Sequence, residues 1–202
     1  EAEMCGNGAR CFGNFAAALL HHDKSAPLPF ETMAGIVTAT FEKDGNVTVN
    51  LTDPHSLQLF VLNADPAVGA DVHFLNTGVP HAVAFLDKLD GLDVPRLGAY
   101  LRYHSAFSPK GTNANFARIL SPGHIAIRTY ERGVEDETLA CGTGMTASAL
   151  LHAVLTDAPS PIQVYVAGGD TLKVGFQRTG DRFTNVTLTG PADLVFTGDI
   201  EL

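Results

Sequence analysis

Apolar residues recur at helical spacing in two segments of the chain, residues 9–20 (ARCFGNFAAALL) and residues 145–155 (MTASALLHAVL). Both segments are rich in alanine and leucine, which enter helices at low cost in free energy. Each segment directly follows a tetrapeptide of cysteine, glycine, a polar residue and glycine. The pattern therefore predicts two helices, each with a glycine-rich start.

Many of the other apolar residues lie in short runs of β-branched and aromatic residues, which are typical of strands. The runs at residues 36–41 and 47–51 flank the sequence EKDGN, and this arrangement predicts a hairpin. Further strands are predicted at residues 81–86, 113–120, 124–130, 162–167, 171–178, 183–189 and 194–197. Because short strands outnumber helices, we expect a mixed α+β fold with curved or barrel-like sheets, and not a doubly wound parallel sheet.

The composition sets the size and the class of the molecule. A chain of 202 residues, 45% of them hydrophobic, can bury the core of one large domain or of two small lobes. The formal net charge of −9 and the lack of any run of Lys or Arg argue against a nucleic-acid or anionic-membrane partner. No apolar stretch of the sequence approaches the roughly 20 residues of a membrane-spanning helix. We therefore expect a cytoplasmic protein that acts on a small molecule.

The three cysteines are too few, and odd in number, for the disulfide framework of a secreted domain, so reduced thiols are expected. Two of them open the tetrapeptides Cys5-Gly6-Asn7-Gly8 and Cys141-Gly142-Thr143-Gly144. At a helix N-terminus, unpaired backbone N–H groups and the helix dipole favour a thiolate. The glycines also let the backbone approach and hold an anion such as a carboxylate. The duplication thus predicts two equivalent loops that face one ligand.

Two such loops would leave one thiol on each side of the ligand's α-carbon. Of Cys5 and Cys141, one as thiolate would remove the α-proton, and the other as thiol would deliver a proton to the opposite face. The configuration at the α-carbon would invert. The sequence therefore predicts a cofactor-independent amino-acid epimerase that uses these two cysteines as acid and base.

Other interpretations of the cysteines remain open at this level. A cysteine in a single motif of this kind is more often a small buried residue. A disulfide between Cys5 and Cys141 needs an oxidising compartment. A zinc site is disfavoured because Cys5 and Cys11 lack the usual spacing of ligand pairs, and no metal is expected. Cys11, inside the apolar helix, is expected to lie in the core.

Longer stretches around the two tetrapeptides resemble a known family. Residues 4–11 (MCGNGARC), and residues 130–133 (YERG) followed by residues 138–144 (TLACGTG), resemble the two signature motifs of diaminopimelate epimerases. Residues 77–81 (TGVPH), residues 111–116 (GTNANF) and the closing GPA and GDI also resemble that family in order and spacing. The resemblance covers essentially the whole chain.

This resemblance implies the interconversion of LL- and meso-diaminopimelate, on the route to lysine and to peptidoglycan. It implies two pseudo-symmetric lobes, each a curved mixed sheet or barrel around a central helix. It also implies a homodimer that works without a cofactor. Residues 1–54 and 190–202 are expected to form the N-terminal lobe, and residues 55–189 the C-terminal lobe.

The roles that the resemblance implies fall on named positions. Cys5 and Cys141 match the two acid–base thiols. Four positions in the two loops match residues that bind the carboxylate at the reacting end of the substrate: Gly6, Asn7, Gly142 and Thr143. In the family, further ligands lie upstream of the first cysteine motif, so we expect sequence before Glu1 and an incomplete first lobe in this chain.

Four more positions complete the implied site. His81 matches a residue that supports catalysis, and Asn113 matches one that binds substrate. Glu131 and Arg132 match a pair in which Glu131 meets an ammonium and takes part in catalysis, while Arg132 forks onto the distal carboxylate. Without the family context, Glu131 and Arg132 would be interpreted as a solvated pair, and His81 as a core histidine. Val79 replaces an Asn that contacts substrate in many relatives; its backbone or Asn76 is expected to compensate.

Two alternative functions remain open. Proline racemases also carry paired thiols, although the sequence NGARC at residues 7–11 and the pair Glu131 and Arg132 favour a diamino diacid as substrate. Alternatively, the chain is an amino-acid-binding fragment that retains the two loops and lacks turnover. Incorporation of deuterium at the substrate α-carbon separates these alternatives.

Overall fold

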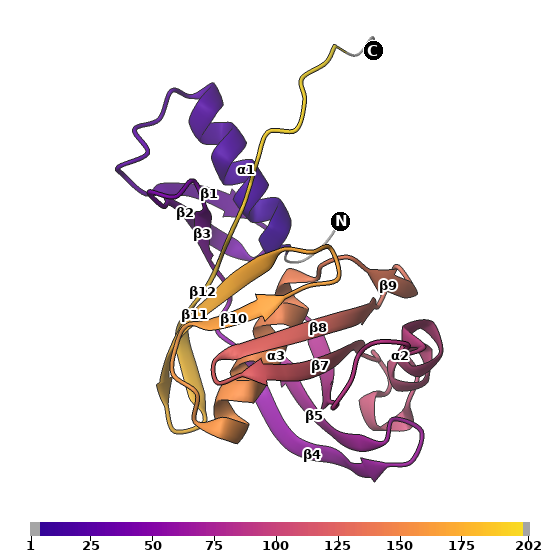
Figure 1. The fold of residues 1–202 in the computed structure, drawn as a ribbon. Coiled ribbons are helices and arrows are strands. Elements are labelled where there is room, and N and C mark those ends of the chain that lie inside the picture. The colour runs from indigo at the N-terminus through magenta and orange to yellow at the C-terminus, as the bar shows by residue number, and fades with distance from the viewer. Residues whose placement is uncertain (1–4, 200–202) are drawn as a thin grey trace.

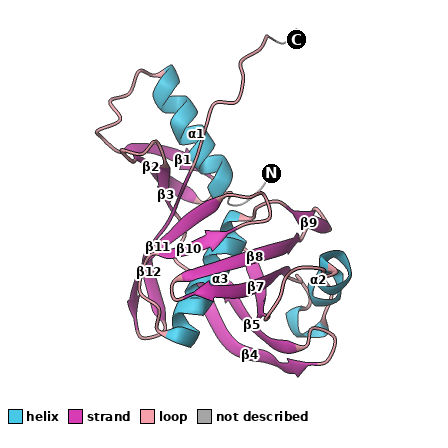
Figure 2. Cartoon of the chain, viewed as in Figure 1, coloured by secondary structure: helices cyan, strands magenta, loops and turns pink. Residues whose placement is uncertain are grey.

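The computed structural model describes residues 5–199, which form a mixed α+β fold dominated by strands (Figure 2). The helices of this part of the chain are α1 (Gly6–Leu19), α2 (Val94–Arg102), α3 (Gly142–Thr156) and a short 3-10 helix at Ser105–Phe107. The strands are β1 (Leu28–Thr32), β2 (Gly35–Phe41), β3 (Val47–Asn50), β4 (His55–Asp65), β5 (Ala70–Asn76), β6 (Pro80–Phe85), β7 (Asn113–Ser121), β8 (His124–Glu131), β9 (Asp136–Thr138), β10 (Ile162–Tyr165), β11 (Thr171–Thr179) and β12 (Arg182–Gly190). The predicted fold class is confirmed.

The strands join into one 12-stranded sheet, with the order β1-β2-β3-β12-β11-β10-β8-β7-β6-β5-β4 and with β9 paired to β8. Most neighbours are antiparallel, but β6 and β7 run parallel, as do β8 and β10. Pairing of β3 with β12 makes the sheet continuous between its two ends. The sheet therefore runs without a break across the boundary expected at residue 54, and the division into two lobes stays a prediction.

Helix α3 occupies the centre of the curved sheet (Figure 1). It packs against strands on both sides of the curve, from β5 to β8 and from β10 to β12. All residues from Gly142 to Ala153 are buried. A helix that is apolar and small on every face has to be enclosed on every face, and the sheet curls around α3 accordingly.

Helix α1 packs on the smaller group of strands β1 to β3, above the rest of the sheet in Figure 1. Gly13 faces this sheet so closely that an added Cβ would lie 2.6 Å from the Cβ of Ala39. Phe15 and Leu19 of α1 are exposed, and the half-exposed Phe12 packs its ring against that of Phe30 on β1, with the ring centroids 4.9 Å apart. Cys11 is exposed as well, so its predicted place in the core is wrong. It belongs to the face of the helix that points away from the strands.

The two predicted helices and the hairpin of β2 and β3 are present, and the turn uses Gly45 with φ +88°. The strand predicted at residues 194–197 is wrong. Leu194, Val195 and Phe196 are exposed and belong to no helix or strand, and a run of apolar residues forms a strand only where a partner strand receives its hydrogen bonds. Within residues 5–199, no helix is long and apolar enough to cross a membrane.

Candidate functional site

Both cysteine motifs form the first turn of a helix, and the glycines lie inside that turn instead of in a loop before it. Cys5 is the N-cap of α1, and its Sγ accepts the N–H of Gly8 at 3.3 Å. Cys141 is the N-cap of α3, and its Sγ lies 3.5 Å from Oγ1 of Thr143. The predicted placement of both thiols at helix N-termini is therefore confirmed.

The two helix starts touch each other. A Cβ added to Gly142 would lie 3.3 Å from the Cα of Gly6 and 3.4 Å from its nitrogen. Leu188 of β12 packs beneath both glycines, because its Cδ2 would meet a Cβ at either position. The amide of Asn7 donates to the carbonyl oxygen of Ala140 at 3.3 Å and so ties the start of α1 to the segment before α3. Side chains at these glycines would push the two helix ends apart.

Burial governs the ionisation of Cys141, which is only 6% exposed. It raises the pKa of this thiol to about 11, the nearby charge of Glu131 adds to the rise, and the polar neighbours Thr143 and Gly144 oppose it. The expectation that a thiolate is favoured at the helix start is thus wrong for Cys141. Loss of hydration outweighs the helix terminus, which contributes at most about 2 kcal/mol.

Glu131 lies at the end of β8, close to the second thiol. Its Oε2 accepts the hydroxyl of Thr138 at 3.0 Å. The charge of Glu131 raises the pKa of Cys141, and Cys5 contributes a smaller rise. Seven of the predicted site residues therefore gather around the start of α3: Cys5, Gly6, Asn7, Glu131, Cys141, Gly142 and Thr143.

His81 of β6 is completely buried and bonds to Asn115 of β7, with 3.1 Å between Nδ1 of His81 and Nδ2 of Asn115. Burial, and secondarily the charge of Arg132, lower the pKa of His81 to about 3. Asn115 also abuts the start of α3, because a Cβ on Gly144 would collide with its Oδ1. Asn115 is absent from the predicted site, although its spacing of two from Asn113 placed both on one face of a strand.

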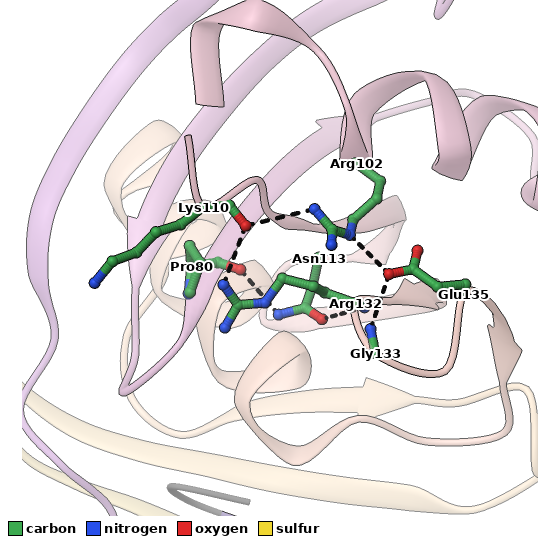
Figure 3. Close-up of polar contacts among 7 residues, drawn as sticks. All are labelled: Pro80, Arg102, Lys110, Asn113, Arg132, Gly133 and Glu135. Atoms are coloured by element: carbon green, nitrogen blue, oxygen red, sulfur yellow. Dashed lines mark hydrogen bonds and ion pairs between the residues drawn. The ribbon is translucent and has the colours of Figure 1, made fainter. Parts of the chain in front are cut away.

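Asn113, the first residue of β7, lies close to Arg132, which directly follows β8 (Figure 3). The amide of Asn113 donates to the carbonyl of Pro80 at 2.9 Å and accepts the backbone N–H of Arg132 at 2.8 Å. The guanidinium of Arg132 donates to the carbonyl of Lys110 at 3.3 Å. A cavity of about 510 Å³ opens beside Arg132 and is also lined by Asn76 and Lys110. Asn113 thus positions the backbone of Arg132, whose side chain borders open space.

Residues 5–199 contain no cluster of three or more His, Cys, Asp or Glu side chains arranged to hold a metal ion. The ordered polar groups of the site are thiols, a carboxylate, an imidazole, amides and the backbone N–H groups of two helix starts. These are groups that bind an anion and move protons.

Comparison with known proteins identifies relatives along the chain. The family model for diaminopimelate epimerase matches residues 73–195. The diaminopimelate epimerase of Hydrogenobaculum sp. (strain Y04AAS1) is 42% identical over 202 residues, which cover 98% of this chain and 70% of that protein. The diaminopimelate epimerase of Aquifex aeolicus (strain VF5) is 40% identical, with 98% of this chain and 69% of that protein covered.

Solved structures share the fold at much lower identity. A PhzF-family phenazine biosynthesis protein of Bacillus anthracis superimposes with a TM-score of 0.65 at 14% identity, covering 95% of this chain and 74% of that one. A probable proline racemase of Agrobacterium radiobacter K84, with bound carbonate, gives 0.60 at 21% identity and covers 82% and 57%. These structures bear on the fold alone. Given the match of the family model and the identity to curated relatives along almost its whole length, the chain belongs to the diaminopimelate epimerase family.

Proposed function

We propose that this chain interconverts LL- and meso-diaminopimelate by moving a proton at the α-carbon between Cys5 and Cys141. The observation that carries the proposal is the contact of the two helix starts at Gly6 and Gly142, each capped by a cysteine. A carboxylate held by both starts has backbone N–H groups on two sides. The two thiols then flank the α-carbon.

Burial raises the pKa of Cys141 to about 11, so Cys141 enters as the thiol. Cys5 is then the base in this half of the reaction, because each face of the α-carbon has one cysteine. The sulfur of Cys5 takes the α-proton, and the electron pair of the C–H bond moves into the carboxylate, which gains enolate character. The thiol of Cys141 then gives its proton to the opposite face of the α-carbon. One proton is taken and one is given, and the two cysteines exchange protonation states.

Stabilising the enolate is the demanding part, because enzymes commonly lower barriers by roughly 8 kcal/mol or more. Two helix termini supply at most about 2 kcal/mol each. Fixed hydrogen bonds from residues 6–7 and 142–143 to the carboxylate, together with exclusion of water, have to supply the rest. Arg132, at the edge of the cavity, is proposed to receive the distal carboxylate, with Glu131 and Asn113 alongside.

Deuterium exchange tests the proposal. The chain is incubated with LL-diaminopimelate in deuterated water, and α-deuterium is measured by mass spectrometry or proton NMR. The wild type is expected to incorporate deuterium, while Cys5→Ser and Cys141→Ser are expected to lose at least about 100-fold in rate, since each loses an acid–base group. Cys11→Ser is the matched control, because Cys11 is an exposed thiol on the outer face of α1, and it retains the wild-type rate.

Two outcomes would contradict the proposal. Full exchange in both serine variants would rule out the two-thiol mechanism. Binding of diaminopimelate without any exchange in the wild type would leave an amino-acid-binding fragment. L-proline, run in the same assay, tests the racemase alternative; the relatives at about 40% identity favour the diamino diacid.

Three further properties belong to the proposal. The lobe division at residues 54 and 190 is supported by the packing of α1 on β1 to β3 and of α3 on β5 to β8 and β10 to β12, so that each group of strands has its own helix. A homodimer rests on the family resemblance, and a cytoplasmic location rests on the composition of the chain. Sedimentation analysis of the purified chain and fractionation of cells test these two properties.

A further inference from the structure

Beneath the start of α3, one polar network lies completely buried and reaches the site from the side of the sheet. His81, Asn115 and Thr129 stand on the adjacent strands β6, β7 and β8 and are at most 2% exposed. Nδ1 of His81 faces Nδ2 of Asn115 at 3.1 Å. Nε2 of His81 is also buried, and among residues 5–199 it has no hydrogen-bond partner. Of the polar atoms in these three side chains, Nε2 alone lacks a hydrogen-bond partner in the described part of the chain.

The backbone decides the orientation of the Asn115 amide. The side-chain atom that faces the carbonyl oxygen of Ala82, at 3.0 Å, has to be the NH₂ group, because a carbonyl oxygen only accepts. The amide oxygen then points to Thr129, whose hydroxyl donates to it at 3.0 Å. The register agrees, since Asn115 and Thr129 are directly opposite on β7 and β8. Gly144 lies beside this oxygen, and a Cβ at position 144 would collide with it.

The amide orientation in turn decides the state of the imidazole. One N–H of Asn115 is used by Ala82, and the other points at Nδ1 of His81, which therefore has to accept. A neutral imidazole that accepts at Nδ1 carries its proton at Nε2. Burial keeps the ring neutral, with its pKa lowered to about 3. Nε2 of His81 is thus an N–H donor that has no acceptor among residues 5–199.

We infer that Asn115 is a positioning residue that holds His81 in the neutral tautomer protonated at Nε2, so that His81 serves the reaction as a hydrogen-bond donor and not as a base. The inference rests on the proposed function for its role in the reaction. A fixed neutral donor stabilises negative charge as it develops and needs no reorganisation at that moment. The two thiols remain the groups that take and give the proton.

The tautomer can be measured without any substrate. The chain is labelled with ¹⁵N-histidine, and two-bond proton–nitrogen correlations are recorded between pH 5 and pH 8, with the His81 signals assigned from their loss in His81→Gln. We expect Nε2 to have the shift of a protonated nitrogen and Nδ1 that of an unprotonated one over the whole range. A proton on Nδ1, or titration near the ordinary histidine pKa of about 6.5, would overturn the inference. Since this NMR measurement involves no turnover, its result does not depend on whether the chain has epimerase activity.

Asn115→Asp tests the positioning role. A carboxylate only accepts, so it would draw the His81 proton to Nδ1 and remove the donor at Nε2. The NMR pattern of His81 is expected to change accordingly, and deuterium incorporation to fall by about 100-fold or more. An unchanged tautomer in a folded Asn115→Asp chain would contradict the inference. If this variant does not fold, the wild-type tautomer decides.

Thr129→Val is the matched control. It removes the hydroxyl on the other side of the Asn115 amide but leaves the contacts of Nδ2 with Ala82 and His81. We expect a loss of stability with the wild-type tautomer and most of the exchange rate retained. If Thr129→Val lowers exchange as much as Asn115→Asp, Asn115 contributes packing alone.

Discussion

At the scale of the residue, environment decides the chemistry of the site more than sequence position does. Cys5 and Cys141 occupy the same place in two similar motifs, yet Cys5 is exposed and Cys141 is buried. The sequence predicted both N-cap positions, because capping depends on neighbours in the chain. It did not predict the raised pKa of Cys141 or the network of Asn115, because both depend on side chains from strands distant in sequence.

His81 makes a prediction for the stability of the whole fold. Its pKa is lowered from 6.5 to about 3. Between pH 3 and pH 6.5, His81 is therefore protonated in the unfolded state but neutral in the folded state. Folding stability from this group is therefore complete above pH 6.5 and is lost as the pH falls toward about 3, with a slope approaching about 1.4 kcal/mol per pH unit.

Urea unfolding of wild type and of His81→Gln at several pH values measures this slope. The variant lacks the titrating ring and should lose less stability on acidification than the wild type does. Other groups, including the buried His152, titrate equally in both proteins and cancel in the comparison. Parallel pH curves for the two proteins would show that His81 is protonated in the folded state with an ordinary pKa.

At the scale of the element, most of the central strands were predicted from the sequence, and the irregular strand β4 was not. The hairpin of β2 and β3 and the strands β6 to β8 and β10 to β12 follow their predicted positions closely. Strand β4 was missed because its alternation is broken by three register shifts and by positive φ angles at Ser56, Phe60 and Ala64. Strands β1, β5 and β9 were missed as well, with five, seven and three residues.

Helix α2 was also missed, although its sequence carries local signals. Asp93 caps it, Pro95 stands in its first turn, and Val94, Leu97 and Leu101 are buried at helical spacing. Its nine residues give a shorter pattern than those of α1 and α3. For such a helix, the cap and the proline are the stronger evidence.

Gly98 makes a prediction for the packing of α2. Alanine usually stabilises a helix relative to glycine by about 1 kcal/mol. Here a Cβ would collide with Cβ and Cγ of Tyr130 on β8, so Gly98→Ala is expected to destabilise the protein by about 1–3 kcal/mol. Gly168→Ala is the control, because its Cβ would meet only ordinary contacts, 3.5 Å or more away. Thermal unfolding of both variants measures the difference, and a gain in stability for Gly98→Ala would contradict the packing described.

At the scale of the whole molecule, the order of the strands in the sheet could not be predicted from the sequence. Local patterns identify strands, but the pairing of β3 with β12 joins segments more than a hundred residues apart. The predicted mixed α+β class was correct because it follows from the number and type of elements. The path of the sheet follows from how those elements bury the apolar faces of α3, which no single segment specifies.

The two cysteine-capped helices are enclosed to different degrees, and this difference should be visible in hydrogen exchange. Residues 142–153 of α3 are all buried, whereas Phe12, Phe15 and Leu19 of α1 are at least 50% exposed. Amides of α3 are therefore expected to exchange only with global unfolding, and those of α1 through local opening at lower free energy. Mass spectrometry of fragments from both helices in one sample provides an internal control. Equal protection of the two helices would contradict this expectation.

The contact between Gly6 and Gly142 has a consequence for the charge at the site. It brings together two helix ends that each carry about half a positive charge, and these two charges repel each other. A bound anion would turn that repulsion into two attractions. A ligand with a carboxylate would then hold the two helix starts against each other and stabilise the folded chain.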